Sequence, residues 1–504
     1  MQITESVGLL VVLATSAFGA ACQSTATDPA PPSGIAGAIA GSSVASAHAG
    51  THVAAAGAPS VGAGNGAGAG GSVAMMMSAS IAGAAGAAGA AGAAKGGAGT
   101  GADAASSHPT SPTASPADDD AGVPTVNPVD LRCQADLAAP QRTDYAQPGP
   151  YAVRTLDVTF EDKSRPILAT DKHPAAASRV LVTTIYYPAA GAGAALAQGG
   201  PFPLLMYSHG YSSGRSEGGP LATRAASYGY VVVAPEFPLT NLTANGGNPD
   251  VGDAVNQAGD VSYLIDQVLS LAANSQHVLA GSVDEARIGA VGVSLGGLTT
   301  LLVAFHPRLH DERVKVAMPI AAASSFFAKG FYHTRAIPSL FLHGDLDAII
   351  NYEQSSRRAF ERAAPNARLI TIAKGTHAAF GAAFDAESLP LLNSLIGAPG
   401  ADPSNADGVG CGAIKDALSM TGPDFVTSFR GPEDFIALEE ASPPPCQGDE
   451  YKQPAFDPTL QADIGVRSGV AFFEAHFAST PNQRQDACRY LLVEVPKSPA
   501  VTLE

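Results

Sequence analysis

The chain has 504 residues, of which 46% are apolar and only 14% are charged, and its 28 Lys and Arg against 45 Asp and Glu give a formal net charge of −17. This acidic balance argues against a nucleic-acid-binding protein, which needs clustered Lys and Arg to displace the counterions of the phosphates. Five cysteines without C-x-x-C spacing exclude a miniprotein built on disulfides and a zinc site of the ribbon type.

The N-terminus has the pattern of an export signal. Residues 7–21 form a 15-residue apolar run that ends at Cys22, and this length fits the core of a signal peptide better than a membrane span. The three small residues before Cys22 are similar to the cleavage site of bacterial lipoproteins, in which the Cys is lipidated. We therefore expect residues 1–22 to be a signal peptide. The exported protein would be an outer-membrane or cell-surface lipoprotein attached to the membrane through Cys22, or a secreted protein after ordinary cleavage.

A low-complexity segment follows the signal. Residues 23–126 are dominated by Gly, Ala, Ser, Thr and Pro. Because Ala and Gly bury too little apolar surface to offset the entropy lost on ordering, we expect a disordered linker that holds the next domain away from a surface. The composition changes near residue 127, and we assign residues 127–504 to one folded domain.

The folded part alternates strand-like and helix-like segments. Two segments of alternating polarity, 151–160 and 179–187, predict half-buried strands. Short continuous apolar runs, which are typical of strands covered on both faces, then follow at residues 203–207, 230–234, 288–293, 314–320, 338–342 and 368–372. Helical patterns lie between them at 255–272, 295–305 and 352–363. This alternation predicts an α/β fold with a mostly parallel sheet and helices on both faces, in which function gathers at the carboxyl ends of the strands.

The pattern Gly-x-Ser-x-Gly points to a candidate nucleophile, and it occurs around Ser212, Ser216 and Ser294. A nucleophilic Ser needs a sharp turn between a strand and a helix, because the turn raises the hydroxyl above the sheet and aims the helix N-terminus at the developing negative charge. Only Ser294 follows an apolar strand and precedes a helix-forming run, whereas the other two lie in the Gly-rich stretch 210–220. The sequence therefore predicts Ser294 as the nucleophile, with a tight structural turn as the alternative.

A Ser hydroxyl also needs a base, and the base needs an orienting acid. The strand at 338–342 is followed by His-Gly-Asp-Leu-Asp, which offers Asp345 and Asp347 as acids. The strand at 368–372 is followed by Lys-Gly-Thr-His, which offers His377 as the base. These candidates lie just past the carboxyl ends of their strands, and we expect them at the same edge of the sheet as the nucleophile.

Acyl transfer requires hydrogen-bond donors for the oxyanion of the tetrahedral intermediate. One donor is expected to be the backbone N–H of Leu295, the residue after the candidate nucleophile. The second should come from the loop after the strand at 203–207. We choose the N–H of Tyr211, because Gly210 before it permits the backbone turn that aims this donor. The alternative is a flexible surface loop.

Four segments together, Ser-His-Gly-Tyr, Gly-Val-Ser-Leu-Gly-Gly, His-Gly-Asp-Leu-Asp and Gly-Thr-His, resemble the α/β-hydrolase superfamily. Residues 179–188 and 260–266 are similar to a bacterial branch. That branch groups predicted dienelactone hydrolases with platelet-activating-factor acetylhydrolase-like and cutinase-like polyester hydrolases. The resemblance covers about 150–380 and the C-terminal helix near 466–478. It implies an α/β-hydrolase fold, and its acid turn usually reads His-Gly-x-x-Asp, which favours Asp347.

The chain departs from these relatives at two points. True dienelactone hydrolases use Cys as the nucleophile, whereas Ser occupies this position here. Polyester hydrolases of this type generally carry a Trp in the substrate cleft, and this chain has no Trp. The resemblance therefore implies neither a dienelactone nor a polymer as the substrate.

An additional segment follows the candidate base. The stretch at about residues 383–460 is longer than a compact hydrolase needs and is rich in Pro, Gly and Asp. We interpret it as an insertion beside the cleft that acts as a lid or a specificity loop. Apart from Cys22, four cysteines remain, and an exported enzyme would pair them. We predict the pairs Cys411–Cys446 and Cys133–Cys488, with free thiols as the alternative.

These features predict an exported serine hydrolase that cleaves carboxylic esters of small molecules, lipids or polymers through an acyl-enzyme. We expect a monomer without a cofactor, a metal or a nucleic-acid partner. One alternative is a serine peptidase of the prolyl-oligopeptidase kind, although the low-complexity linker cannot form the N-terminal propeller of such enzymes. A second alternative is a non-catalytic surface binding protein on a hydrolase fold, against which the spacing of the three candidate residues argues.

Overall fold

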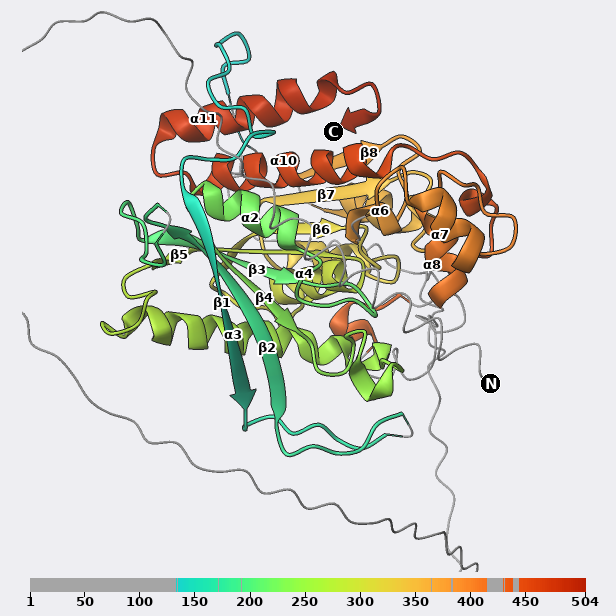
Figure 1. Cartoon of the computed structure of the whole chain (residues 1–504), viewed down its shortest axis with the longest axis horizontal. Coiled ribbons are helices and arrows are strands. Elements are labelled where there is room, and N and C mark those ends of the chain that lie inside the picture. The colour runs from blue at the N-terminus through green and yellow to red at the C-terminus, as the bar shows by residue number, and fades with distance from the viewer. Residues whose placement is uncertain are drawn as a thin grey trace, which may run out of the picture. The chain divides into compact units, whose positions relative to one another are not determined.

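The computed structural model describes residue 133 and residues 135–170, 172–191, 193–363, 365–381, 384–414, 429, 431–437 and 444–504. The predicted signal peptide, its Cys22 and the predicted linker lie outside the described residues. The described part forms a nine-stranded sheet with helices on both faces, so the expected α/β architecture is confirmed (Figure 1). No helix within the described ranges is long and apolar enough to span a bilayer.

The sheet has the strand order β1-β2-β4-β3-β5-β6-β7-β8-β9. The strands are β1 (Ala152–Asp162), β2 (Arg179–Ala189), β3 (Phe202–Ser208), β4 (Val231–Glu236), β5 (Val283–Val293), β6 (Val314–Ile320), β7 (Ser339–Gly344), β8 (Ala367–Ile372) and β9 (Val501–Leu503). Strands β3 to β8 are parallel to one another, whereas β1 and β2 on one side and β9 on the other are antiparallel to their neighbours. The carboxyl ends of six strands therefore meet at one edge.

Helices cover the two faces of this sheet. They are α2 (Gly219–Ser227), α3 (Ala254–Ala273), α4 (Leu295–Phe305), α5 (Arg358–Arg362), α6 (Ala378–Gly381), α7 (Leu389–Ile396), α8 (Ala406–Ile414), α10 (Pro458–Phe477) and α11 (Pro481–Arg489). The shorter helical turns are η1 (Ala244–Gly246), η2 (Val251–Asp253), η3 (Lys329–His333), η4 (Glu353–Arg357), η5 (Gly431–Asp434), η7 (Glu450–Lys452), η8 (Tyr490–Glu494) and η9 (Val495–Lys497). The helix predicted at 352–363 is divided into the π-helical turn η4 and the short helix α5.

The apolar core is split by the sheet into two layers, because successive side chains of a strand point to opposite faces. In β3, Leu204 and Met206 pack in one cluster with residues of α3 and α4. Leu205 and Tyr207 pack in the other with residues of α2, α10 and α11, which lie on the opposite side of the sheet from α3 in Figure 1. Two buried faces explain why these strands are continuous apolar runs.

A buried ion-pair cluster joins β2 to α3. The Nη2 atom of Arg179 lies 2.6 Å from Oδ2 of Asp253 and 2.7 Å from Oδ2 of Asp260, and all three side chains are at most 3% exposed. Arg165 adds a further contact, 2.6 Å from Nη2 to Oδ1 of Asp260. Burial alone would lower the pKa of Arg179, but the hydrogen bonds and charges of the two carboxylates raise it. The cluster thus holds its charges paired inside the protein.

Both predicted disulfides are present. Cys133 pairs with Cys488, with 5.4 Å between their Cα atoms, and this bond joins the start of the described domain to α11. Cys411 pairs with Cys446 at a Cα distance of 5.7 Å, and both lie in the predicted insertion. The described part of this insertion includes α7, α8 and η7, which lie to one side of the sheet (Figure 1).

Candidate active site

Ser294 lies in a strained turn between β5 and α4. Its φ and ψ are 59° and −117°, a conformation that costs free energy for a residue other than Gly. The backbone holds this turn, because the N–H of Ser294 donates to the carbonyl of Ile320 at 2.8 Å. A Cβ on Gly296 would overlap the carbonyl oxygen of Ser208, and one on Gly292 would overlap that of Gly296. The pattern thus forms the expected strand–turn–helix, with Ser294 partly exposed at its tip.

The two other Ser of the same pattern lie in the loop between β3 and α2. Ser212 also has a positive φ, 56°, but its N–H donates to the carbonyl of Thr240 in the segment after β4. Ser216 is exposed. Neither residue connects a strand end directly to a helix. The elements around the pattern, and not the backbone angle alone, therefore distinguish Ser294.

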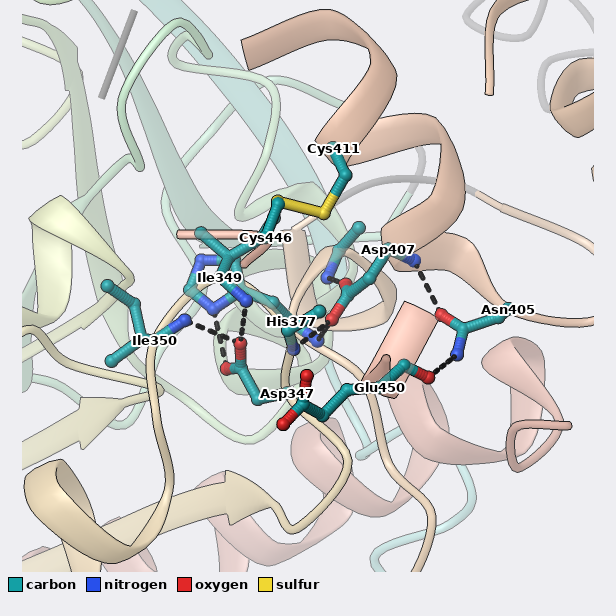
Figure 2. The surroundings of a disulfide bond; sticks show 11 residues. Asp347, Ile349, Ile350, His377, Asn405, Asp407, Cys411, Cys446 and Glu450 are labelled. Atoms are coloured by element: carbon teal, nitrogen blue, oxygen red, sulfur yellow. Dashed lines mark hydrogen bonds and ion pairs between the residues drawn. A yellow bond between two sulfur atoms is a disulfide. The ribbon is translucent and has the colours of Figure 1, made fainter. Parts of the chain in front are cut away.

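Asp347 is a buried carboxylate past the carboxyl end of β7, and Figure 2 shows it beside His377, Ile349 and Ile350. Its Oδ1 accepts hydrogen bonds from the N–H groups of Ile349 at 2.8 Å and Ile350 at 2.7 Å. Its Oδ2 lies 2.7 Å from Nδ1 of His377 and 2.8 Å from Nε2 of His343. Burial alone would raise the pKa of Asp347, but the charge of His377 and the hydrogen bonds of both imidazoles hold it well below its usual range.

Asp345, the competing candidate acid, has a different role. Its side chain is exposed, and its Oδ1 accepts a hydrogen bond from the N–H of Lys374 at 2.6 Å. The N–H of Asp345 in turn donates to the carbonyl of Ile372 at 3.1 Å. Asp345 therefore fastens the turn after β7 to the turn after β8, and only Asp347 contacts the candidate base.

His377 lies in the loop between β8 and α6 and is 6% exposed. Because a carboxylate can only accept, the 2.7 Å contact assigns the proton of Nδ1 to the hydrogen bond with Asp347, which leaves Nε2 as the basic nitrogen of the neutral ring. Burial alone would lower the pKa of His377, but the charge and the hydrogen bond of Asp347 raise it. The site thus favours an imidazolium once the ring takes up a proton.

The sequence did not reveal the role of His343. It lies near the end of β7, is fully buried and contacts the candidate acid. Its Nδ1 lies 2.7 Å from the hydroxyl oxygen of Ser356 in η4. The sequence signal for this contact was the spacing, because His343 lies in β7 and precedes Asp347 by four residues. Within the described ranges no group of three or more His, Cys, Asp and Glu side chains is placed to hold a metal ion.

The predicted oxyanion loop lies against the candidate nucleophile. A Cβ on Gly210 would be 3.4 Å from the Cβ of Ser294, so Gly permits this close approach. Tyr211 follows, and its hydroxyl donates to the carbonyl of Pro249 at 2.9 Å, which anchors the loop. Leu295 is the first residue of α4, where a backbone N–H has no acceptor within the helix. The donor roles of Tyr211 and Leu295 stay predictions.

A carboxylate that the sequence analysis did not identify lies beneath this loop. Oε2 of Glu217 accepts hydrogen bonds from the N–H of Gly210 at 2.9 Å and the hydroxyl of Tyr207 at 3.0 Å. Burial raises the pKa of Glu217 to about 7, against the opposing effects of these hydrogen bonds and of His377. A Cβ on Gly381, in the helix just after His377, would lie 2.9 Å from Oε1 of Glu217. Glu217 therefore borders both the loop that carries Tyr211 and the helix α6 that directly follows His377.

Comparisons with known proteins identify relatives of this chain. The family model described as PETase, PET hydrolase-like, matches residues 163–388, a range that contains Ser294, Asp347 and His377. A cutinase of Thermobifida alba, Cutinase est1, is 28% identical to the chain over 168 residues. This alignment covers 33% of the chain and 47% of the cutinase, so the chain spans about half the length of this curated relative.

Proposed function

Because the chain is an α/β-hydrolase related to the cutinase-like polyester hydrolases, we propose that it is an exported serine hydrolase that cleaves carboxylic esters. The main support is the 2.7 Å hydrogen bond between His377 and Asp347, at the edge of the sheet where Ser294 lies in its strained turn. The partial exposure of Ser294 agrees with a nucleophile that meets a substrate from solvent.

In the proposed reaction, the hydroxyl oxygen of Ser294 attacks the ester carbonyl while Nε2 of His377 takes up its proton. Asp347 holds the ring and stabilises the imidazolium. The N–H groups of Leu295 and Tyr211 donate to the oxyanion of the tetrahedral intermediate. His377 then gives the proton to the departing alcohol, which leaves an acyl group on Ser294. A water molecule, deprotonated by His377, attacks this acyl-enzyme, and His377 returns the proton to the oxygen of Ser294 as the acid leaves.

The substrate is proposed only as a class, a carboxylic ester of a small molecule, a lipid or a polymer. The matching family is described as PET hydrolase-like and the curated relative as a cutinase, but the chain has no Trp for an aromatic clamp. Export is part of the proposal because two disulfides require an oxidising compartment to form and persist. The proposal also includes attachment to a membrane through a lipidated Cys22 and action as a monomer.

A single substitution tests the proposed nucleophile. Ser294→Ala should reduce kcat/KM for p-nitrophenyl butyrate by about 10⁴-fold or more and abolish labelling by a fluorophosphonate probe, because it removes the hydroxyl to which the proposal assigns the acyl-enzyme. Ser216→Ala is the matched control, since this exposed Ser has the same local pattern and should retain most of the activity.

Two results would contradict the assignment. Rapid ester turnover by Ser294→Ala would show that another residue is the nucleophile. An unlabelled wild-type protein without ester turnover would favour the non-catalytic binding protein instead. A parallel assay with a peptide p-nitroanilide separates an esterase from a peptidase, which should cleave the anilide at a comparable rate.

A further inference from the structure

A buried carboxylate of the insertion contacts the backbone at both the candidate acid and the candidate base. Asp407, in the first turn of α8, is completely buried. Its Oδ2 accepts hydrogen bonds from the N–H groups of Ala348 at 2.8 Å and His377 at 3.1 Å, and its Oδ1 accepts one from Ala378 at 2.7 Å (Figure 2). Ala348 directly follows Asp347 in the chain. One side chain therefore joins the loop after β7 to the loop after β8.

The insertion holds the other side of Ala348 as well. The carbonyl of Ala348 accepts a hydrogen bond from the N–H of Cys446 at 2.7 Å. Cys446 is disulfide-bonded to Cys411, which lies one turn after Asp407 on α8. Asp407 and Cys446 thus bind the two polar backbone groups of Ala348, and the disulfide shown in Figure 2 holds their two segments together.

Asn405 fixes the start of α8 on which Asp407 lies. Its Oδ1 accepts a hydrogen bond from the N–H of Asp407 at 3.0 Å. Its Nδ2 donates to the carbonyls of Glu450 and Gln453, each at 3.0 Å. Asn405 therefore connects the start of α8, which carries Asp407, to the segment after Cys446. A positioning residue needs such a rigidly held backbone.

We infer that Asp407 is a positioning residue for the ester hydrolysis proposed above, and that through it the insertion fixes the loops of Asp347 and His377 relative to each other. The inference rests on the proposed function, because it assigns Asp407 no reactivity of its own. It differs from the role expected from the sequence, in which the insertion acts as a lid or a specificity loop.

Electrostatics distinguish this role from ordinary hydrogen bonding in a core. Burial raises the pKa of Asp407 to about 6, and the charge of Asp347 adds to this effect. Above that pH the ionised Asp407 faces His377 and favours its protonated form. The charges that act on His377 besides Asp407 are those of Asp347 and Glu217, and His343 from β7 contacts Asp347. Among the elements packed around the pair, η7 carries Glu450, Tyr451 and Lys452 and α10 carries Asp463, Arg467, Glu474 and His476, whereas α6 and α7 carry no titratable side chain.

The test separates the charge of Asp407 from its position. In Asp407→Asn the amide keeps one acceptor oxygen and loses the charge, so kcat for p-nitrophenyl butyrate should fall about 10- to 100-fold with little change in KM. Without the charge the pKa of His377 should fall, and the acidic limb of the kcat–pH profile should move to lower pH. Asp407→Glu keeps the charge but displaces it, so kcat should fall while the acidic limb stays in place.

Asp434→Asn is the matched control. Asp434 is also a completely buried carboxylate of the insertion, but it pairs with Arg308, at 2.6 Å and 2.9 Å. This variant should lower the melting temperature and leave the acidic limb unchanged. The three variants and the wild type are compared by kcat, KM and thermal melting between pH 5 and pH 9.

Each outcome decides the inference. A wild-type kcat and pH profile in Asp407→Asn would overturn it, and so would a fall in kcat with an unmoved acidic limb, which indicates a purely structural role. If Asp407→Asn does not fold, Asp407→Glu carries the test, and an unchanged kcat in that variant would overturn the inference. A wild-type enzyme without ester turnover would refute the proposed function itself.

Discussion

The raised pKa of Glu217 makes the stability of the whole protein depend on pH. Its pKa is raised to about 7 by burial, so the native state retains a proton that the unfolded chain releases above the usual value of 4.5. The native state then binds more protons than the unfolded state between these two values, and stability falls as the pH rises through this window. The carboxyl group also accepts a hydrogen bond from the N–H of Gly210. The group that causes this loss of stability therefore lies against the predicted oxyanion loop.

Glu217→Gln should remove this pH dependence while leaving an oxygen to accept the N–H of Gly210. We expect the melting temperature of the variant, relative to the wild type, to rise by about 2 °C or more between pH 5 and pH 8. Melting curves in matched buffers measure this difference. Glu387→Gln, at an exposed position, controls for the loss of one negative charge. Parallel melting curves for Glu217→Gln and the wild type would contradict the expectation.

At the scale of elements, the contact between β2 and α3 depends on charges rather than on apolar packing alone. Arg179 is at most 3% exposed and bridges Asp253 and Asp260. Two buried carboxylates are costly without their cation, because neither is compensated by water. The pairing therefore fixes the position of α3 against the antiparallel side of the sheet.

Arg179→Met should destabilise the protein by about 3–5 kcal/mol, since it leaves the buried Asp253 without its cation and Asp260 with Arg165 alone. The control is Arg215→Met, because Arg215 is 31% exposed and pairs with Asp157, which is 63% exposed. That variant should cost about 1 kcal/mol or less. Urea unfolding of both variants measures the difference. Equal midpoints for the two variants would show that the buried cluster contributes no more than the surface pair.

All eight predicted strands are present in the structure, because the pattern that predicts each strand lies within the strand's own residues. Each strand of the parallel part is a short apolar run covered on both faces, and Ser294, Asp347 and His377 each lie within a few residues of a strand end. The helices α2 and α11 and the three-residue strand β9 were not predicted, since they are short and carry no sustained periodic pattern. Their places in the fold are set by contacts with distant segments.

The roles of Glu217 and Asp407 were not predictable for the same reason. Glu217 lies inside the Gly-rich stretch 210–220, where the Gly-x-Ser-x-Gly pattern points to Ser and not to the carboxylate. Its contacts with Tyr207 and Gly210 are visible only in three dimensions. Asp407 lies 60 residues after Asp347, in a segment without periodicity, and contacts the backbone of Ala348 and not a side chain. A hydrogen bond to a backbone N–H does not depend on the type of the donating residue. No sequence pattern could therefore have linked Asp407 to Asp347.

At the scale of the whole molecule, we expect one disulfide to contribute mainly to stability and the other to the geometry of the candidate site. Cys133–Cys488 spans 355 residues and closes the described domain end to end, whereas Cys411–Cys446 spans 35 residues within the insertion. In the chain-entropy model the longer loop restricts the unfolded chain more, about 6 kcal/mol against about 4 kcal/mol. The shorter loop, however, includes the Cys446 N–H that binds the carbonyl of Ala348, beside the candidate acid.

The two bonds should therefore separate stability from activity. Replacing Cys133 and Cys488 together by Ser should lower the melting temperature more, and kcat for p-nitrophenyl butyrate should stay near the wild-type value, because this bond lies at the ends of the domain. Replacing Cys411 and Cys446 together should lower the melting temperature less but reduce kcat about 10-fold or more, since Ala348 loses a rigid partner. Kinetics and melting of both double variants, below their melting temperatures, make the comparison. If the pair in the insertion can be removed without loss of kcat, its covalent bond does not help to hold the acid in place.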